Sequence, residues 1–342
     1  MTVKPVSRSR AQQMGRQAAG ALAAMSLAAG IFSMGSAQAQ DWPSRPIRIV
    51  VPTATGGVVE TVVGLTNSQV EKRLGQRIVV ENRPGGGGNI GAQAVLNSPA
   101  DGYTFMIAPS NVLVTNQFMT DKPPFDPLKE FAPVTQLVEV PLVFWVNSKL
   151  QHTTLRDLID DIRANPGKFN YASPGPGTPP HLAGELFTRA AGLSAVHIAY
   201  KGAAAAANDL IANEVQLMII GYASLRGQFQ GKLVRPIAVA ASQRLTALPQ
   251  VPTVLESGFA AIDAEIHRGW WGLFAPRGTP AQLIERMSSE YRAALTSPDL
   301  QARLGEAGLV AIGNSPAEFS AMLPAQAAQW QKIVKTLGLR FN

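Results

Sequence analysis

The chain has 342 residues, a hydrophobic fraction of 46%, a formal net charge of +7 and no cysteine. This length and apolar content predict a compact protein that is large enough to divide into two lobes, and they exclude a disordered chain. The absence of cysteine excludes thiolate catalysis and thiolate metal sites, and it fits an oxidising compartment in which the fold does not rely on disulfides.

The first 39 residues predict a cleaved export signal. They hold four basic residues and no acidic one, and the basic residues are Lys4, Arg8, Arg10 and Arg16. An apolar, alanine-rich run over residues 18–34 follows, and Ala37-Gln38-Ala39 has the small-x-small pattern that signal peptidase recognises. A membrane anchor is the alternative, but the run is short and no later segment is apolar enough to span a bilayer. We therefore expect a Sec-type signal at residues 1–39, a mature chain from about Gln40, and a periplasmic location.

Loss of this segment changes the charge of the chain. Without its four basic residues, the formal net charge falls from +7 to +3. A surplus that small does not indicate nucleic acid or a membrane surface as a partner. It is compatible with a small anionic ligand, although it does not require one.

Short apolar runs alternate with segments of helical periodicity along the rest of the chain. In the first part we expect strands at 47–52, 78–81 and 103–108, and helices at 59–74 and 90–97. A second set has strands at 140–146, 170–172, 195–199, 215–220 and 234–239, and helices at 154–164, 180–191 and 203–212. A late strand at 270–275 precedes helices at 280–296, 298–307 and 316–337. This alternation predicts βαβ units and mixed, mainly parallel sheets.

The two sets predict an α/β protein with two lobes, each a sheet flanked by helices. The strands around Val143 and Trp271 are expected to cross between the lobes, so the first lobe takes both ends of the mature chain. The predicted division is residues 40–143 and 271–342 for lobe 1, and 144–270 for lobe 2. Two crossing segments would form a hinge, with a ligand cleft between the lobes.

Two glycine-containing loops stand where a strand leads into a helix. They are Thr53-Ala54-Thr55-Gly56-Gly57 and Ser173-Pro174-Gly175-Pro176-Gly177-Thr178. Glycines let the backbone turn tightly and expose N–H groups, and the N-terminus of the following helix favours an anion. Neither loop ends in the Gly-Lys-Ser/Thr of a phosphate-binding P-loop. Each alone is better explained as an ordinary turn, but two of them, one in each predicted lobe, indicate a binding site.

Other residues complete the predicted site. A third glycine-rich turn, Pro84–Gly88, lacks the spacing of a dinucleotide fingerprint, so a structural turn is expected, with Asn89 as the member that faces a ligand. Lys201 ends a strand and is either a solvated lysine or a charge at the mouth of the cleft. The full set of ligand-binding candidates is Thr53, Ala54, Thr55, Gly56, Gly57, Asn89, Ser110, Asn111, Ser173, Gly175, Gly177, Thr178, His181, Lys201, Gly221 and Tyr222.

The histidines do not predict a metal site or a catalytic centre. No pair among His152, His181, His197 and His267 has the i, i+4 spacing of a helical zinc site, and no acidic residue falls at a suggestive offset. His181, at a helix start, either hydrogen-bonds a ligand carboxylate or caps the turn. A Ser173–His181 nucleophile–base pair is conceivable, but no Gly-x-Ser-x-Gly elbow surrounds it. We therefore expect no enzyme, no metal and no cofactor.

Motifs spread over the whole predicted mature chain resemble a known family. They are Trp42–Ile47, Val51-Pro52 with Gly56-Gly57, Val80–Gly85, Gly88–Gly91, Asp101–Thr104, Phe125–Leu128, Phe131–Val134, Asn170–Ser173 with Gly175 and Gly177, His181–Glu185, Tyr200–Gly202, Leu248–Thr253 and Ala275–Pro280. In this order and spacing they closely resemble the Bug family, the substrate-binding receptors of tripartite tricarboxylate transporters of the TctC type.

The resemblance implies a two-lobed periplasmic-binding-protein fold that closes over its ligand like a Venus flytrap. It implies capture of a small organic carboxylate, held largely by backbone groups and bridging waters from the first loop and its opposite strand. It also implies delivery to membrane permease subunits, or presentation of the closed form to a membrane sensor. A periplasmic hydrolase is the less favoured alternative, since no set of nucleophile, base and orienting acid is apparent. We expect a monomer.

The chain departs from the pattern of the family at positions near the predicted cleft. Glu60 stands where the family usually has Asp, and Gly64 stands where Arg is common. Thr53 replaces a frequent Phe. In the second set, the usual Met-Phe-Asp-Asn is here Met218-Ile219-Ile220-Gly221. These changes predict an unusual or larger ligand.

Overall fold

The computed structural model describes residue 2 and residues 42–56, 58–265 and 269–338. The predicted export signal, apart from Thr2, lies outside the described residues, and so does the predicted site residue Gly57. The chain forms two structural units, Met1–Ser44 and Arg45–Asn342, and every helix and strand named below belongs to the second. Within the described residues, no helix combines the length and the apolar character needed to cross a bilayer.

A six-stranded sheet is built from both ends of the second unit. In spatial order its strands are β11 (Val310–Ala311), β4 (Phe131–Val140), β10 (Gly269–Pro276), β3 (Thr104–Pro109), β1 (Ile47–Val51) and β2 (Ile78–Asn82). β1 pairs in parallel with β2 and β3, whereas β10 is antiparallel to β3 and β4, and β11 is antiparallel to β4. The helices of this part are α2 (Val58–Leu74), η1 (Gly86–Gly88), α3 (Asn89–Leu96), η2 (Asn111–Thr115), η3 (Asn116–Phe118), α4 (Pro127–Glu130), α10 (Ala281–Leu295), α11 (Pro298–Glu306) and α12 (Pro316–Leu337).

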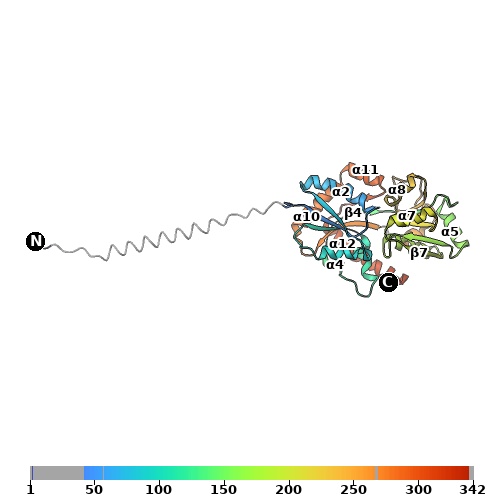
Figure 1. Ribbon diagram of the computed structural model, residues 1–342, viewed down its shortest axis with the longest axis horizontal. Helices are drawn as coiled ribbons and strands as arrows, with labels where there is room; N and C mark the ends of the chain where they lie inside the picture. The colour runs from blue at the N-terminus through green and yellow to red at the C-terminus, as the bar shows by residue number, and fades with distance from the viewer. Residues whose placement is uncertain (1, 3–41, 57, 266–268, 339–342) are drawn as a thin grey trace. The chain divides into compact units, whose positions relative to one another are not determined.

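A five-stranded sheet is built from the middle of the chain. Its spatial order is β7 (Ala195–Ala199), β6 (Phe169–Ser173), β8 (Leu217–Gly221), β5 (Leu142–Asn147) and β9 (Val234–Ala240). β6 is parallel to β7 and β8, whereas β5 is antiparallel to β8 and β9. Its helices are α5 (Leu155–Ala164), α6 (Pro179–Ala190), α7 (Ala203–Ala212), α8 (Tyr222–Gln230) and α9 (Ala260–Glu265). Figure 1 shows α2, α10 and β4 grouped with the first sheet, and α5, α7 and β7 grouped with the second.

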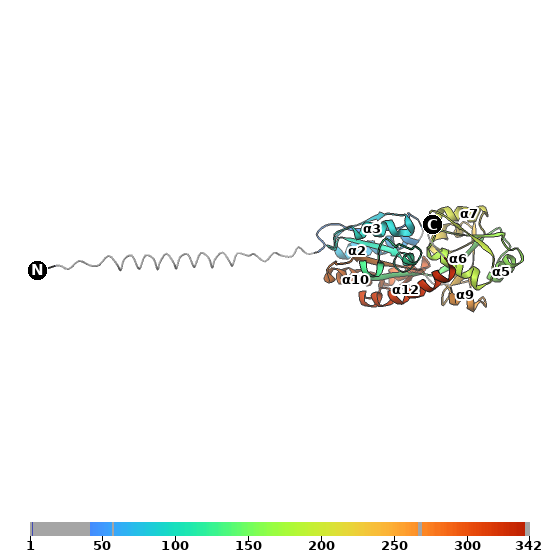
Figure 2. The same ribbon diagram turned by 90° about the horizontal axis from the view of Figure 1, so that it is seen from below.

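The chain passes between the sheets at two places. Pro141 alone separates β4 of the first sheet from β5 of the second, and the segment after β9 returns the chain to β10. The helix α6 adds a third connection, because its Leu182 and Leu186 pack with the first core while Phe187 packs with the second. Figure 2 shows the C-terminal part of α12 extending to α6. Trp330 of α12 belongs to the same cluster as Leu182.

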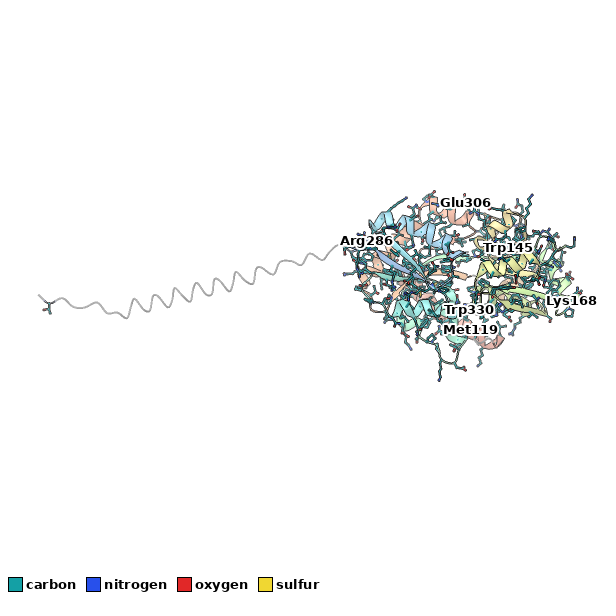
Figure 3. The ribbon with its side chains drawn as sticks, viewed as in Figure 1. Met119, Trp145, Lys168, Arg286, Glu306 and Trp330 are labelled. Carbon is teal, nitrogen blue, oxygen red and sulfur yellow. The ribbon has the colours of Figure 1, made fainter. Side chains whose placement is uncertain are left out.

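Buried apolar side chains fill both sides of each sheet. One cluster joins Val50 and Met106 of the first sheet to Phe319 and Trp330 of α12. Two others lie on either face of the second sheet, and one of them surrounds Trp145. Figure 3 labels Trp145, which lies in the core of the second sheet, and Trp330, which lies in the core of the first sheet.

Most predicted elements are present, and three have the predicted bounds: α7, α12 and β7. The mixed, helix-flanked sheets are confirmed, but parallel pairing does not predominate. Among the described pairings, two of five in the first sheet and two of four in the second are parallel. The reason is that β4, β5 and β10 pair with strands that run in the opposite direction. The periodicity of a segment predicts that it is a strand but not the direction of its neighbours.

The strand predicted at 140–146 is present as β5 and belongs to the second sheet, as expected. The ten-residue strand β4 that precedes it was not predicted. Pro133 lies inside β4, and the pairing of β4 with β10 is irregular beside it. A proline inside an apolar run argues against a regular strand, so the sequence signal for β4 is weak. The helices α8 and α9 and the short strand β11 were also not predicted.

Candidate functional site

A cleft of about 580 Å³ is lined by residues from both sheets. The first sheet contributes the loop after β1, the glycine turn after β2, and the ends of β3, β4 and β10 that meet there. The second contributes the start of β5, the loops after β6 and β7, and the end of β8. Most of these segments lie at the carboxyl ends of parallel strands, which is where open α/β sheets bind ligands.

The first predicted loop lines the cleft with all four of its described residues, 53–56. Its main chain turns at Gly56, whose φ of +104° lies in the left-handed region that favours glycine. Asn82 Nδ2 donates a hydrogen bond to Thr53 O over 3.2 Å and ties the loop to the end of β2. The loop therefore presents backbone groups and small side chains to the cleft.

The second predicted loop, residues 173–178, is held in shape by hydrogen bonds from two sides. The N–H of Gly177 donates to Nδ1 of His181 over 3.0 Å. From the segment after β7, the N–H groups of Tyr200 and Gly202 donate to loop carbonyl groups, each over 3.0 Å. The loop is therefore a fixed part of the cleft wall.

The two sheets approach each other closely around the cleft. A Cβ atom added at Gly202 would lie 3.9 Å from Cβ of Ala54, so the loops of the two sheets are at van der Waals distance there. A Cβ added at Gly269 of β10 would lie 3.3 Å from Pro179 of α6. Small residues therefore stand where the two sides of the cleft meet.

The third glycine-rich turn also lines the cleft, but through its glycines. Gly87 O accepts hydrogen bonds from Asn111 Nδ2 over 2.9 Å and from Asn116 Nδ2 over 3.0 Å. Asn116 Nδ2 also donates to Asn89 Oδ1 over 2.9 Å. Asn89 thus helps to fix the turn and is not among the lining residues, in contrast to its expected role.

Among the helices whose N-cap residue is described, four begin at the cleft without a side-chain cap. Their N-cap residues, which all line the cleft, are Gly88 for α3, Thr178 for α6, Gly202 for α7 and Gly221 for α8. The helices α5, α11 and α12 start elsewhere, and each has a capping hydroxyl; α10 is uncapped and also starts elsewhere. First-turn N–H groups have no partner within their helix and carry the positive end of the helix dipole. In α6, two prolines remove two of these donors.

Lys201 is the only charged side chain among the described lining residues, and it is exposed. Its neighbour Tyr200 donates to Asp209 Oδ2 over 2.6 Å. Burial and this hydrogen bond raise the pKa of Tyr200 to about 12, so the phenol stays neutral at physiological pH. The described part of the cleft therefore carries a net positive charge.

The structure gathers nine of the predicted site residues at the cleft: Thr53, Ala54, Thr55, Gly56, Asn111, Gly175, Thr178, Lys201 and Gly221. Six others lie outside the lining: Asn89, Ser110, Ser173, Gly177, His181 and Tyr222. Lining residues that sequence reasoning missed are mainly apolar, including Val58, Val59, Trp270 and Trp271. The sequence does not single out the two tryptophans, because an aromatic pair gives the same signal in a core and in a cleft.

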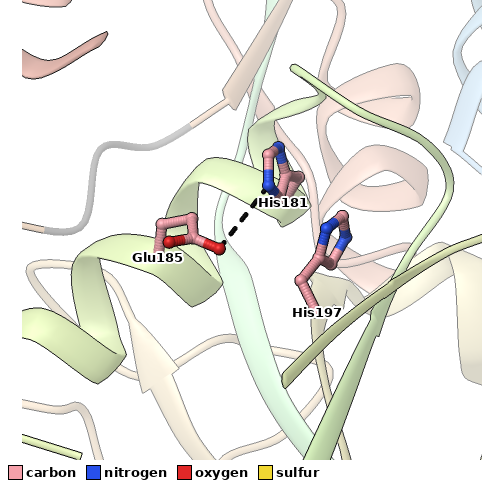
Figure 4. A group of neighbouring side chains, drawn as sticks. All are labelled: His181, Glu185 and His197. Atoms are coloured by element: carbon pink, nitrogen blue, oxygen red, sulfur yellow. Dashed lines mark ion pairs between the residues drawn. The ribbon is translucent and has the colours of Figure 1, made fainter. Parts of the chain in front are cut away.

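His181, for which a ligand contact and a cap of the turn were both left open, accepts the Gly177 N–H and lies in a partly buried group behind the second loop (Figure 4). His181 Nε2 lies 3.6 Å from Glu185 Oε1, and Tyr171 donates a short hydrogen bond to that oxygen. His181 and Glu185 are four residues apart on α6. The expectation that no acidic residue stands at such a spacing from a histidine is therefore wrong. The His181 imidazole, the Tyr171 hydroxyl and other neighbouring groups hold the pKa of Glu185 below its ordinary value, against the effect of burial.

His197 completes this group. Its ring stacks on that of His181 with 3.9 Å between centroids, and Ser173 Oγ lies 2.7 Å from its Nε2. Burial and the neighbouring His181 lower the pKa of His197 to about 4.

One potential ligand atom from each of His181, Glu185 and His197 lies within 4.8 Å of the other two, which is close enough for a metal site. However, a metal binds an imidazole in the plane of its ring, and two stacked rings direct their nitrogen lone pairs along parallel planes. His181 Nδ1 also already accepts the N–H of Gly177. The arrangement fits a structural support for the loop better than a metal centre.

A serine–histidine pair is present, but with a different histidine from the one considered. Ser173 approaches His197 and not His181. The serine is fully buried, does not line the cleft, and also contacts Gly175 O over 3.1 Å. A nucleophile must reach its substrate, so this geometry does not support hydrolysis.

The departures from the family pattern are not all at the cleft. Glu60 and Gly64 lie on the exposed face of α2 and do not line it. Ile220 and Gly221 do line it. A Cβ atom at Gly221 would come within 2.6 Å of Val140 Cγ1 and 3.2 Å of Val58 Cγ2, so a larger residue does not fit there.

Comparisons with known proteins identify relatives along almost the whole chain. Residues 62–339 match the model of the tripartite tricarboxylate transporter family receptor, TctC. The UPF0065 protein in the tcbD–tcbE intergenic region of Pseudomonas sp. strain P51 is 33% identical over 325 residues, which cover 94% of this chain and 95% of that protein.

Two solved structures are similar to the fold. The R. palustris protein Rpa4515 with adipate has a TM-score of 0.83 and 32% identity, over 88% of this chain and 99% of that chain. The periplasmic binding protein BugD has a TM-score of 0.80 and 30% identity, over 87% of this chain and 99% of that chain. The matched family is one of solute receptors and not of enzymes. The chain belongs to the tripartite tricarboxylate transporter receptor family, of the Bug and TctC type.

Proposed function

We propose that the chain is the periplasmic receptor of a tripartite tricarboxylate-type transporter and that its cleft captures a small organic carboxylate. The supporting observation is the convergence of four uncapped helix N-termini on a cleft whose one charged side chain, among the described residues, is Lys201. Oriented N–H groups and a cation favour an anion, and no acidic residue in the described lining opposes it.

Backbone groups would carry most of the recognition. The loop residues 53–56, 174–176 and 178 present main chain and small hydroxyl side chains to the cleft. Lys201 adds an attraction that water screens, because the side chain is exposed. A carboxylate held mainly by N–H groups and bridging water leaves the rest of the cleft free to determine selectivity.

The family match and the N-terminal sequence support a proposal for the location and the mechanism. We propose that the signal at residues 1–39 is removed in the periplasm and that the mature chain acts as a monomer. Residues 40–143 with 271–342, and residues 144–270, would form two lobes that close on the ligand and then engage the permease subunits. Support for the ligand class comes from the similar structure of Rpa4515, which contains adipate.

Calorimetric titration of the mature chain against acetate, hexanoate, succinate, adipate, malate and citrate tests the proposal. At least one carboxylate should bind, and neutral and cationic analogues of the same length, hexanol and hexylamine, should not. Binding of hexylamine or hexanol without binding of any carboxylate would refute the assignment of an anionic ligand.

A variant that removes the charge of Lys201 tests whether the ligand binds in the cleft or elsewhere on the surface. Lys201→Met should weaken binding up to about fivefold, which corresponds to about 1 kcal/mol for a solvent-screened charge. Lys149→Met removes another exposed lysine that does not line the cleft and should leave affinity unchanged. Equal affinities for the two variants would show that the ligand binds elsewhere.

A further inference from the structure

A large part of the cleft lining is apolar. Seven lining residues form this apolar wall: Val58, Val59, Val140, Leu142, Ile220, Trp270 and Trp271. Each of them is less than a tenth exposed. They come from α2, β4, β5, β8 and β10, so elements of both sheets contribute to one surface.

Strand pairing explains why the members of the apolar wall are neighbours. Gly269, which precedes the two tryptophans, pairs with Val140 across β10 and β4. Leu142 pairs with Gly221 across β5 and β8. Only Pro141 separates Val140 from Leu142, so the wall continues from the first sheet into the second where the chain crosses.

Gly221 keeps polar groups out of this wall. An added Cβ would meet Val140 Cγ1 at 2.6 Å and Val58 Cγ2 at 3.2 Å. The two valines therefore occupy the space into which a side chain at 221 would extend. A hydrogen-bonding residue at position 221 would require one of the valines to move. The apolar wall is therefore hydrocarbon at this point.

Trp270, one of the two largest members of the wall, offers no further polar contact to a ligand. The indole N–H of Trp270 donates to Gln326 Oε1 over 2.8 Å, so it is already satisfied. The ring of Trp270 packs edge-on against Phe319 with centroids 5.3 Å apart, which fixes its position. A rigid aromatic surface of this kind favours apolar ligand groups.

We infer that this receptor selects a monocarboxylate with a bulky apolar body, either an unbranched alkyl chain or an aromatic ring, and not a short dicarboxylate. The inference rests on the proposed function, because it places the carboxylate at the loops and Lys201. The rest of the ligand lies on the apolar wall. The cleft volume of about 580 Å³ falls within the range of pockets that enclose ligands larger than a four-carbon acid.

A matched pair of acids tests the inference directly. Hexanoate and adipate have the same six-carbon chain, and they differ in that a methyl group replaces the second carboxylate. Calorimetric titration should give a dissociation constant at least tenfold lower for hexanoate, and a comparable one for 3-phenylpropanoate. From acetate to hexanoate, each added methylene should strengthen binding about fourfold.

A variant pair assigns the effect to the wall. Val58→Thr places a hydroxyl in the wall with little change of volume, and it should weaken hexanoate binding at least fivefold without weakening adipate binding. Val63→Thr makes the same change elsewhere on α2, outside the lining, and should affect neither acid. Circular dichroism and a melting curve of each variant show whether it is folded before it is titrated.

The outcomes distinguish the two proposals. If adipate or malate binds as tightly as hexanoate or more tightly, the carboxylate receptor stands and the inference about the apolar body is wrong. If no carboxylate binds at all, the proposed function itself fails. An equal loss for Val58→Thr and Val63→Thr would show that the wall does not contact the ligand.

Discussion

Replacement of Gly184 by alanine is expected to destabilise this protein, although the same change usually stabilises a helix. Gly184 lies within α6, beneath the ring of Tyr171. An added Cβ would come within 2.1, 2.5 and 2.8 Å of three ring carbons. Tyr171 is buried, stacks on His197 with centroids 5.0 Å apart, and donates to Glu185, so its ring cannot move aside without losing these contacts.

Two opposing terms determine the size of the effect. Alanine in a helix interior is favoured over glycine by about 1 kcal/mol. Overpacking of a filled core costs about 1–3 kcal/mol, and the loss of the Tyr171 hydrogen bond to Glu185 adds about 1 kcal/mol. The clash outweighs the helix propensity, so the unfolding free energy should fall by about 2 kcal/mol.

Urea titration at 25 °C measures this difference. The matched control is Gly227→Ala in α8, where an added Cβ meets nothing within 4 Å. The control should be more stable than the wild type by up to about 1 kcal/mol, so the two variants should shift the midpoint in opposite directions. If Gly184→Ala is as stable as the wild type or more stable, the account of α6 packing on Tyr171 is wrong.

Three further predictions concern residues near the cleft. Tyr171→Phe removes the donor to Glu185 and should lower the unfolding free energy by about 1–2 kcal/mol, and an unchanged urea midpoint would contradict this. The pKa of His197 is about 4 in the folded chain against an ordinary value of 6.5. Between these pH values the unfolded chain binds a proton that the folded chain does not, so stability should fall as the pH drops from 6.5 to 4. Allowing for partial exposure, the loss is about 1–2 kcal/mol, and His197→Asn should flatten this part of the pH profile. Gly88→Ala places a Cβ 2.5 Å from Val112 at a φ of +104° and should cost about 2 kcal/mol or more, as a lower melting temperature will show.

The sequence predicted the part of the site that is formed by main-chain groups and small residues. Glycines at strand ends are visible in a sequence, because only they adopt the positive φ that a tight loop needs, and Gly56 and Gly175 do line the cleft. His181 could not be placed in the same way. A histidine at a helix start has the same local signal whether it faces a ligand or supports the loop from behind, and here it accepts the Gly177 N–H.

Local sequence determined the individual elements of this protein. Periodicity and proline or serine at the boundary set the limits of α12, whose capping box at Ser315 and Glu318 is a contact between close neighbours in the chain. The motifs spread along the chain determined the family. These features depend on interactions within a few residues or on direct similarity, so no knowledge of distant contacts was needed.

Only the tertiary structure decided how the elements combine. The antiparallel directions of β10 and β5 depend on hydrogen bonds between strands that are distant in the chain. The apolar wall is likewise assembled from five elements, and Val58, Val140 and Gly221 become neighbours only when the two sheets meet. In the sequence, each valine looks like an ordinary core residue. The residues that place it at the wall of a cleft are far away in the chain, so its local sequence does not reveal this position.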